Sequence, residues 1–137
     1  MEWIKDEFLL TDDFDRVDTD VAYQLLKDTY WGDRRPRDVV ERIVKTSLCF
    51  SLLYEDKQVG FARAVSDYTV FSWIADVVIH PDHRGKGLGK WMVSCIIEHP
   101  KIRMTQMVLQ TGDAHRLYEK YGFTQNPMLM GRPPEGV

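Results

Sequence analysis

A basic, glycine-rich segment contains the residues best suited to bind an anion. It runs from Arg84 to Lys90 with glycines at 85, 87 and 89, directly after an apolar run. Glycines let the backbone approach a ligand closely, and the first amides of a helix have no internal partner. The helix dipole and the basic side chains both favour a phosphate. The segment therefore predicts a pyrophosphate site at the start of a helix.

Two common phosphate motifs do not fit this segment. A Walker A loop needs a glycine five residues before its Gly-Lys pair and then Ser or Thr, but here those positions are Arg84 and Trp91. A dinucleotide fingerprint needs a different glycine spacing. The segment does fit R-x-x-G-x-G/A, and in this it resembles the GNAT superfamily of acetyl-CoA-dependent N-acetyltransferases. The resemblance implies that acetyl-CoA is the co-substrate and that this loop binds its pyrophosphate.

A second motif lies nearer the end of the chain. Residues 114–123 resemble the A-x-x-[FL]-Y-x-x-x-G-F signature of that family. The resemblance implies that Tyr118 lies near the coenzyme A sulfur and protonates the departing thiolate as a general acid. The alternative is a packed aromatic residue with a satisfied hydroxyl. The family often has Asn three residues before the alanine, and this chain has Thr111 there, which can still bond to the cofactor.

Asp76 is the one acidic residue in the apolar run from 70 to 79. A carboxylate in such a strand is costly unless a partner or a cleft stabilises it. Three roles stay open for it: general base for the amine, anchor for the ammonium group of the acceptor, or ion-pair partner of Arg63 on the neighbouring strand. A base is useful because an alkylammonium group has a pKa of about 10.4 and must lose a proton before it attacks.

The acceptor site is expected where the resembling family builds its substrate pockets. Aromatic faces and carboxylates both attract an amine cation. The candidate residues are Tyr30, Trp31, Asp67, Tyr68 and Phe71. For each of them, packing at the rim of the fold is the competing interpretation.

The periodicity of apolar residues predicts the elements that position these motifs. Strands are expected over 3–10, 48–54, 59–65, 70–79 and 106–110, with closing strands at Phe123 and 128–130. Helices are expected from a cap at 18–20 to about residue 30, from Pro36 through residue 44, from 88 to 96, and from a cap at Asp113 to a stop at Gly122. The order is that of an α+β (mixed α/β) chain.

This order resembles the GNAT fold along almost the whole chain, which predicts a single domain over residues 1–137. The resemblance implies a mixed, mostly antiparallel sheet flanked by helices, in which strands 70–80 and 106–111 run parallel and splay apart. The pantetheine arm then pairs with one strand edge, and the amide of Val78 clamps the thioester carbonyl. An ordinary paired central strand is the alternative. The implied cofactor-binding residues are Val77, Val78, Ile79, Arg84, Gly85, Lys86, Gly87, Leu88, Gly89, Lys90, Thr111 and Tyr118.

The amino-acid composition and charge limit the classes of partner that the chain is expected to bind. The net charge is −3, which does not favour nucleic acid. The first 33 residues hold ten acidic and three basic side chains, so the rest of the chain is positive. This uneven distribution suits an anionic cofactor and a cationic amine. The alternative is that it reflects only the solvation of surface helices. Cys49 and Cys95 are 46 positions apart and are expected to be free thiols. No metal-ligand spacing, signal peptide or membrane span is predicted, so a cytoplasmic location is expected.

The function expected from these features is transfer of an acetyl group from acetyl-CoA to a primary amine, by direct attack of the amine on the thioester. A small-molecule acceptor is favoured because the chain is short. The alternatives are a non-catalytic acyl-CoA-binding regulatory module and an acetyltransferase acting on protein N-termini or lysines. A nucleotide binder is disfavoured by the acidic net charge and the failed Walker pattern. Dimers are common in the resembling family, so a homodimer is one expectation.

Overall fold

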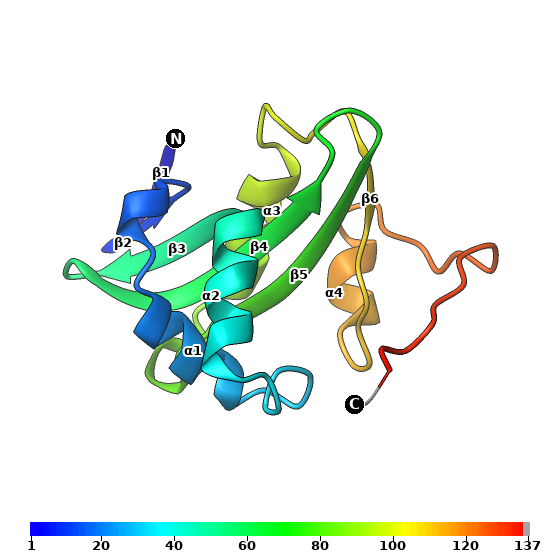
Figure 1. Cartoon of the computed structure of the whole chain (residues 1–137). Helices are drawn as coiled ribbons and strands as arrows, with labels where there is room; N and C mark the ends of the chain where they lie inside the picture. Colours follow the sequence, from blue (N-terminus) through cyan, green and yellow to red (C-terminus); the bar gives the residue numbers. More distant parts are fainter. Residues whose placement is uncertain (136–137) are drawn as a thin grey trace.

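The computed structural model describes residues 1–135, which form one six-stranded sheet with helices on both faces (Figure 1). The strands follow one another in space in chain order, β1 to β6. The elements are β1 (Glu2–Lys5), β2 (Phe8–Thr11), α1 (Thr19–Lys27), α2 (Arg37–Thr46), β3 (Leu48–Tyr54), β4 (Lys57–Ser66), β5 (Phe71–Ile79), α3 (Leu88–Ile97), β6 (Gln106–Val108) and α4 (His115–Glu119). Two 3-10 turns, Phe14–Arg16 and Pro81–His83, lie between them. The expected mixed α/β class is confirmed.

Two apolar cores hold the helices to the sheet. On one face, α1 and α2 pack over β4 and β5 through Leu26, Val40 and Phe61. On the other face, α3 buries Met92 and Ile96 against Phe50 and its neighbours. The apolar face of α3, from which this helix was expected, is therefore buried, and the N-terminus of α3 is held beside the end of β5. No helix among residues 1–135 is long and apolar enough to span a membrane.

The strands β5 and β6 run parallel and then separate. They pair only from Phe71 opposite Gln106 to Trp73 opposite Val108, while β5 continues to Ile79. All the other neighbouring strands pair antiparallel. The predicted splaying of these two strands is confirmed, and it leaves one edge of β5 open over its second half. In Figure 1, α4 overlaps the segment that follows β6, and both lie apart from α1 and α2.

The predicted strands differ from the structure at both ends of the chain. The first strand is in fact the hairpin β1–β2, because Asp6 adopts a left-handed φ of 53° and turns the chain between Lys5 and Phe8. The closing strands are also wrong, since residues 120–135 contain no strand. There Asn126 makes a turn, accepting bonds from the amides of Met128 and Leu129.

Candidate active site

A cleft of about 1600 Å³ opens where β5 and β6 separate. One wall is β5 from Trp73 to Val77, and the loop between α1 and α2 extends this wall. The opposite wall is formed by β6, by the segment that follows it, and by α4. The cleft thereby brings together six residues that the sequence predicts for the site: Tyr30, Trp31, Asp76, Val77, Thr111 and Tyr118.

The basic loop lies at one end of β5, beside a smaller hollow of about 240 Å³. Within residues 1–135 the amides of residues 85–90 donate no hydrogen bond, and the first helical bond of α3 runs from Trp91 N to Gly87 O. Gly85 and Gly87 have φ values of 82° and 76°, a left-handed backbone that glycine adopts without strain. A row of unpartnered amides at a helix start has the geometry to bind an anion.

The side chains of the loop divide between the hollow and the protein surface. Arg84 and Lys90 line the hollow, and Arg84 Nε donates to the carbonyl of Ile79 at 2.9 Å. The ammonium of Lys86 instead lies 5.5 Å over the ring of Phe8 on β2. Lys5 of β1 reaches within 4.0 Å of the place where a side chain at Gly87 would begin. Lys5 adds positive charge beside the loop, and no feature of the sequence indicated it.

Tyr118 faces the cleft from α4 with a hydroxyl that has no hydrogen-bond partner within the described part of the chain. Burial raises the pKa of this hydroxyl above its ordinary value, with smaller contributions from Asp113 and Tyr30. The hydroxyl therefore keeps its proton at neutral pH. A protonated phenol directed into a cleft is able to act as a proton donor.

The end of α4 fixes the orientation of the Tyr118 ring. Gly122 has a φ of 87° and its amide donates to the carbonyl of Glu119, while the amide of Phe123 donates to the carbonyl of Tyr118. This pair of bonds ends the helix as a Schellman motif, in which the residue after the glycine packs back on the helix. Here the ring of Phe123 lies edge-on to Tyr118, with 6.0 Å between ring centroids. The predicted stop at Gly122 is confirmed.

Thr111 supports α4 from its other end. Its hydroxyl accepts from the amide of Ala114 at 2.9 Å and from that of Asp113 at 3.4 Å. Asp113, the predicted cap, makes no such side-chain bond, because the helix begins one residue later. Tyr121 ties α4 to the basic loop, since its hydroxyl donates to the carbonyl of Lys90 at 2.9 Å. The predicted cofactor residue Thr111 lines the cleft, and it also orders the helix that carries Tyr118.

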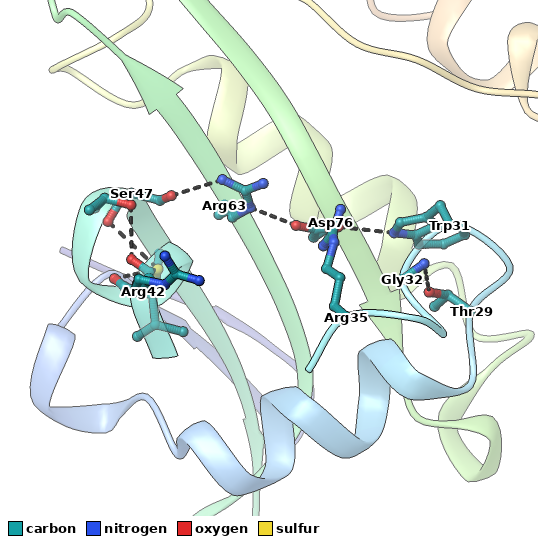
Figure 2. Close-up of polar contacts among 11 residues, drawn as sticks. Thr29, Trp31, Gly32, Arg35, Arg42, Ser47, Arg63 and Asp76 are labelled. Carbon is teal, nitrogen blue, oxygen red and sulfur yellow. Dashed lines mark hydrogen bonds and ion pairs between the residues drawn. The ribbon is translucent and has the colours of Figure 1, made fainter. Parts of the chain in front are cut away.

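Asp76 is the centre of a buried polar cluster (Figure 2). Its Oδ2 accepts from Arg63 Nε at 2.6 Å, so the ion pair, one of the three roles left open for Asp76, is present in the structure. Its Oδ1 accepts from Arg35 Nη1 at 2.7 Å and from Trp31 Nε1 at 3.0 Å. Arg63 Nη1 in turn donates to the hydroxyl of Ser47. Both carboxylate oxygens therefore already have donors, two of them on the α1–α2 loop.

A bulge in β5 positions this cluster. Phe61 pairs with Val78 and Arg63 pairs with Ala75, so Asp76 and Val77 together lie opposite Ala62 alone. Asp76 takes a left-handed φ of 57°, which a side chain with a Cβ adopts at a cost. Bulges redirect backbone groups and are frequent beside active sites. This one lies where β5 has already left β6.

The backbone N–H and C=O groups of successive β5 residues point alternately toward β4 and toward the open cleft. His80 N donates to the carbonyl of Val59 at 2.8 Å, and hydrogen-bonded pairs recur at every second residue of an antiparallel ladder. Val78 is therefore turned toward its partner Phe61 on β4, whereas Val77 and Ile79 face the open side. The bond from Arg84 to the carbonyl of Ile79 fits this alternation. The amide of Val78 is consequently not available as the carbonyl clamp that the resemblance implied.

The expected acceptor residues fall into two groups. Tyr30 and Trp31 line the cleft, with their rings edge to face and 5.0 Å between centroids. Asp67 and Tyr68 lie in the turn between β4 and β5, and Phe71 is the first residue of β5. None of the three is among the residues that line the cleft. Asp67 Oδ1 accepts from the amides of Thr69, Val70 and Phe71, and these bonds lower the pKa of its carboxyl. Asp67 thus shapes the turn.

Comparisons with known proteins agree with this geometry. A family model described as an acetyltransferase (GNAT) domain matches residues 45–125. An uncharacterised N-acetyltransferase, ycf52, of Pyropia yezoensis is 35% identical over 76% of this chain, and the chain spans 63% of that protein's length. A crystal structure from Xanthomonas campestris pv. campestris, of a protein assigned to the GNAT family, superposes with a TM-score of 0.89 at 35% identity over 95% of both chains.

A further solved structure shares the fold and contains the cofactor of that protein. It is a GNAT family acetyltransferase from Elizabethkingia anophelis with acetyl-CoA bound, which has a TM-score of 0.68 and 17% identity over 88% of this chain and 78% of its own. At this level of identity the likeness concerns the fold alone. The family model and the Xanthomonas structure carry the assignment: the chain belongs to the GNAT family of N-acetyltransferases.

Proposed function

We propose that the protein transfers the acetyl group of acetyl-CoA to the primary amine of a small acceptor, which attacks the thioester directly. The observation that carries this proposal is the unpartnered hydroxyl of Tyr118 on the cleft wall, on the same short helix as Leu117, which lines the hollow of the basic loop. In this proposal the basic loop at the end of β5 binds phosphate, the open edge of β5 comes next, and Tyr118 on α4 is the proton donor.

The residues present fit coenzyme A. The unpartnered amides of residues 85–90 suit the two phosphates of the pyrophosphate, and Arg84 and Lys90 add positive charge at the same hollow. The open side of β5 leaves the backbone groups of Val77 and Ile79 for an extended, amide-containing arm. Bound in this way, acetyl-CoA supplies the acetyl group as a thioester at the level of the bulge.

Two groups of the chain act on the thioester in this proposal. The amide of Val77, which faces the open side of the bulge, donates to the carbonyl oxygen as negative charge builds there. The Tyr118 hydroxyl holds a proton for the sulfur, and its raised pKa keeps that proton in place until the thiolate departs. Both groups are held by elements with defined partners, β4 for the bulge and Phe123 for the ring.

Asp76 acts in this proposal as a positioning residue rather than as the base. Its two oxygens accept three bonds from Arg63, Arg35 and Trp31, so the carboxylate holds the α1–α2 loop against β5. The amine then gives its proton to solvent at the open mouth of the cleft. Transfer through a cysteine is disfavoured, because burial raises the pKa of Cys49 to about 12 and neither cysteine lines the cleft.

A thiol-release assay with acetyl-CoA and a panel of amines tests the proposal. Release of coenzyme A should depend on the amine, and wild-type protein should bind coenzyme A in calorimetry. Binding without turnover of any amine would instead support the acyl-CoA-binding regulator. Absence of binding by both coenzyme A and acetyl-CoA would overturn the proposal altogether.

A further inference from the structure

The α1–α2 loop gives one wall of the cleft an excess of positive charge. Arg34 and Arg35 both line the cleft. Asp76, the acidic residue among those that line this wall, is shared between Arg35 and the buried Arg63, so one carboxylate faces two guanidinium groups. Arg34 forms no ion pair with any residue from 1 to 135. The residues that line this wall therefore carry more positive than negative charge.

The guanidinium groups are free to bind a ligand. Arg35 uses only Nη1 in its contacts within the described chain, and its side chain is 25% exposed. Arg34 is exposed. The planar fork of Arg matches the two oxygens of a carboxylate or a phosphate. Bonds from Trp31 and Arg35 to Asp76 hold this part of the loop in place, so the fork of Arg35 is already oriented.

The opposite wall has the opposite charge. Asp113 and Glu119 line the cleft on and beside α4, where Tyr118 is found. Asp113 lies near enough to Tyr118 to contribute to its raised pKa. The cleft is therefore polarised, with acidic groups beside the proton donor and basic groups across from it. An amine is favoured near Tyr118, and an anion is favoured near Arg34 and Arg35.

We infer that the acceptor carries an anionic group, a carboxylate or a phosphate, on the same small carbon skeleton as its amine, and that Arg34 and Arg35 bind this group. The inference rests on the proposed function, because it concerns the acceptor of that reaction. It replaces the expectation of a purely cationic amine. The rings of Tyr30, Trp31 and Trp73, which line the same wall, supply apolar contact for the carbon skeleton.

The cofactor does not account for these arginines. Its phosphates are expected at residues 84–90, at the end of β5, whereas Arg35 contacts Asp76, three residues earlier on the strand. At about 3.3 Å per strand residue, Asp76 lies roughly 10 Å from Ile79, which is the last residue of β5 before the basic loop. The Arg34–Arg35 wall is thus at the acceptor end of the cleft.

The test uses matched amines with the full-length protein and acetyl-CoA. Alanine is compared with alaninamide and ethylamine, phenylalanine with phenylalaninamide and phenethylamine, and 2-aminoethyl phosphate with ethanolamine. Values of kcat/KM are calculated per neutral amine, because the amines differ in pKa. The inference expects the anionic member of at least one set to exceed its uncharged partners by about ten-fold or more, as charge-assisted hydrogen bonds suggest. The sets distinguish a carboxylate from a phosphate.

Arg34→Glu is the test variant, because Arg34 is exposed and lies outside the Asp76 cluster. It should reduce the advantage of the anionic acceptor to less than about three-fold while the affinity for coenzyme A, measured by calorimetry, stays unchanged. Lys45→Glu is the control, since it makes the same change of charge on α2 at an exposed position that does not line the cleft. That variant should keep the preference.

Each outcome decides between the proposals. Equal or faster turnover of the uncharged amines by wild-type protein overturns the inference and leaves the proposed function standing, as does a preference that survives Arg34→Glu. If coenzyme A binds and no amine reacts, the same amines are titrated into the coenzyme A-loaded protein by calorimetry. Equal affinity for the members with and without an anionic group then overturns the inference. Failure to bind coenzyme A refutes the proposed function itself.

Discussion

Asp76 and Arg63 form an ion pair across the bulge between β4 and β5, with 2.6 Å between Arg63 Nε and Asp76 Oδ2. The two side chains are only 1% and 7% exposed. Water therefore cannot replace either partner if the other is removed. The pair also joins the sheet to the α1–α2 loop, because the second oxygen of Asp76 binds Arg35 and Trp31.

We expect Asp76→Asn to lower the free energy of unfolding by about 3–5 kcal/mol, because it leaves the buried Arg63 cation without a countercharge. Asn has nearly the same shape and tolerates the left-handed φ at this position. Urea denaturation at neutral pH measures the loss. The control is Asp38→Asn, which removes an exposed pair with Arg42 at 3.4 Å and should cost less than about 1 kcal/mol. Equal losses in the two variants would contradict the buried-pair argument.

The same variant separates positioning from base catalysis. If Asp76 removed the proton of the amine, Asp76→Asn would abolish the acidic limb of the pH profile of kcat/KM. Since its oxygens are already engaged, we expect a lower rate with the acidic limb retained. A flat acidic limb in a folded Asp76→Asn protein would assign the base role to Asp76 and refute the positioning role.

Tyr118→Phe should lower kcat by about 100-fold, within the range usual for general acids, with little change in the affinity for coenzyme A. Stability should change little, because the hydroxyl has no partner within residues 1–135. Burial raises the pKa of this hydroxyl, so the proton donor should persist up to at least about pH 10 and kcat should not fall through Tyr118 below that pH. A variant as fast as wild type would exclude Tyr118 as the proton donor.

A stability measurement at alkaline pH checks the same pKa shift independently. The pKa of Tyr118 is raised on folding, so above the unfolded value of about 10 the folded state binds more protons than the unfolded state. The stabilising contribution is therefore complete below that pH and declines as the pH rises further. Wild-type protein should lose more stability than Tyr118→Phe between about pH 9.5 and 11, and identical profiles would contradict the shift.

The glycines of the basic loop should differ sharply in their tolerance of alanine. Gly87 has a φ of 76°, where a Cβ costs about 1–2 kcal/mol and would distort the row of amides. Gly89 lies in the first turn of α3 with open space around it, and the family motif itself accepts alanine there. We expect Gly87→Ala to weaken coenzyme A binding more than ten-fold and to destabilise the fold.

Gly89→Ala is the matched control. It should keep the affinity for coenzyme A within about three-fold and raise stability by up to about 1 kcal/mol, because alanine favours the helix. Calorimetry and thermal unfolding of both variants give the comparison. Equal weakening by the two substitutions would mean that open space, and not backbone conformation, is what the loop requires.

Much of the fold was predictable because the signals were local. The glycine spacing of residues 84–89, the apolar stripe of α3 and the stop at Gly122 each depend on residues close in sequence. The hairpin β1–β2 was missed because the apolar pattern continues across Asp6 and Glu7, and only the left-handed φ of Asp6 breaks the strand. The C-terminal strand was predicted from apolar character alone, yet Asn126 turns the chain there and Met128 remains exposed.

The contacts that assemble the site come from distant segments, which the sequence does not connect. Arg35 precedes Asp76 by 41 positions, and no spacing rule links them. The hydroxyl of Tyr121 likewise donates to the carbonyl of Lys90, 31 positions earlier in the chain. The pairing of Asp76 with Arg63 could be considered from sequence because the two strands form a hairpin. The bulge that turns Val78 to β4 has no sequence signal of its own.

Direct transfer predicts that both cysteines are dispensable. Burial raises the pKa of Cys49 to about 12, while Arg63 lowers it and Asp76 raises it by smaller amounts, and burial also raises the pKa of Cys95. Both thiols therefore remain protonated at neutral pH, and a protonated thiol is a poor nucleophile. The Cys49→Ala/Cys95→Ala protein, if folded by circular dichroism, should retain kcat within about three-fold and give intersecting rather than parallel double-reciprocal plots. Parallel plots in wild-type protein that disappear with either cysteine, together with an acetylated thiol in mass spectrometry, would replace direct attack by a covalent route.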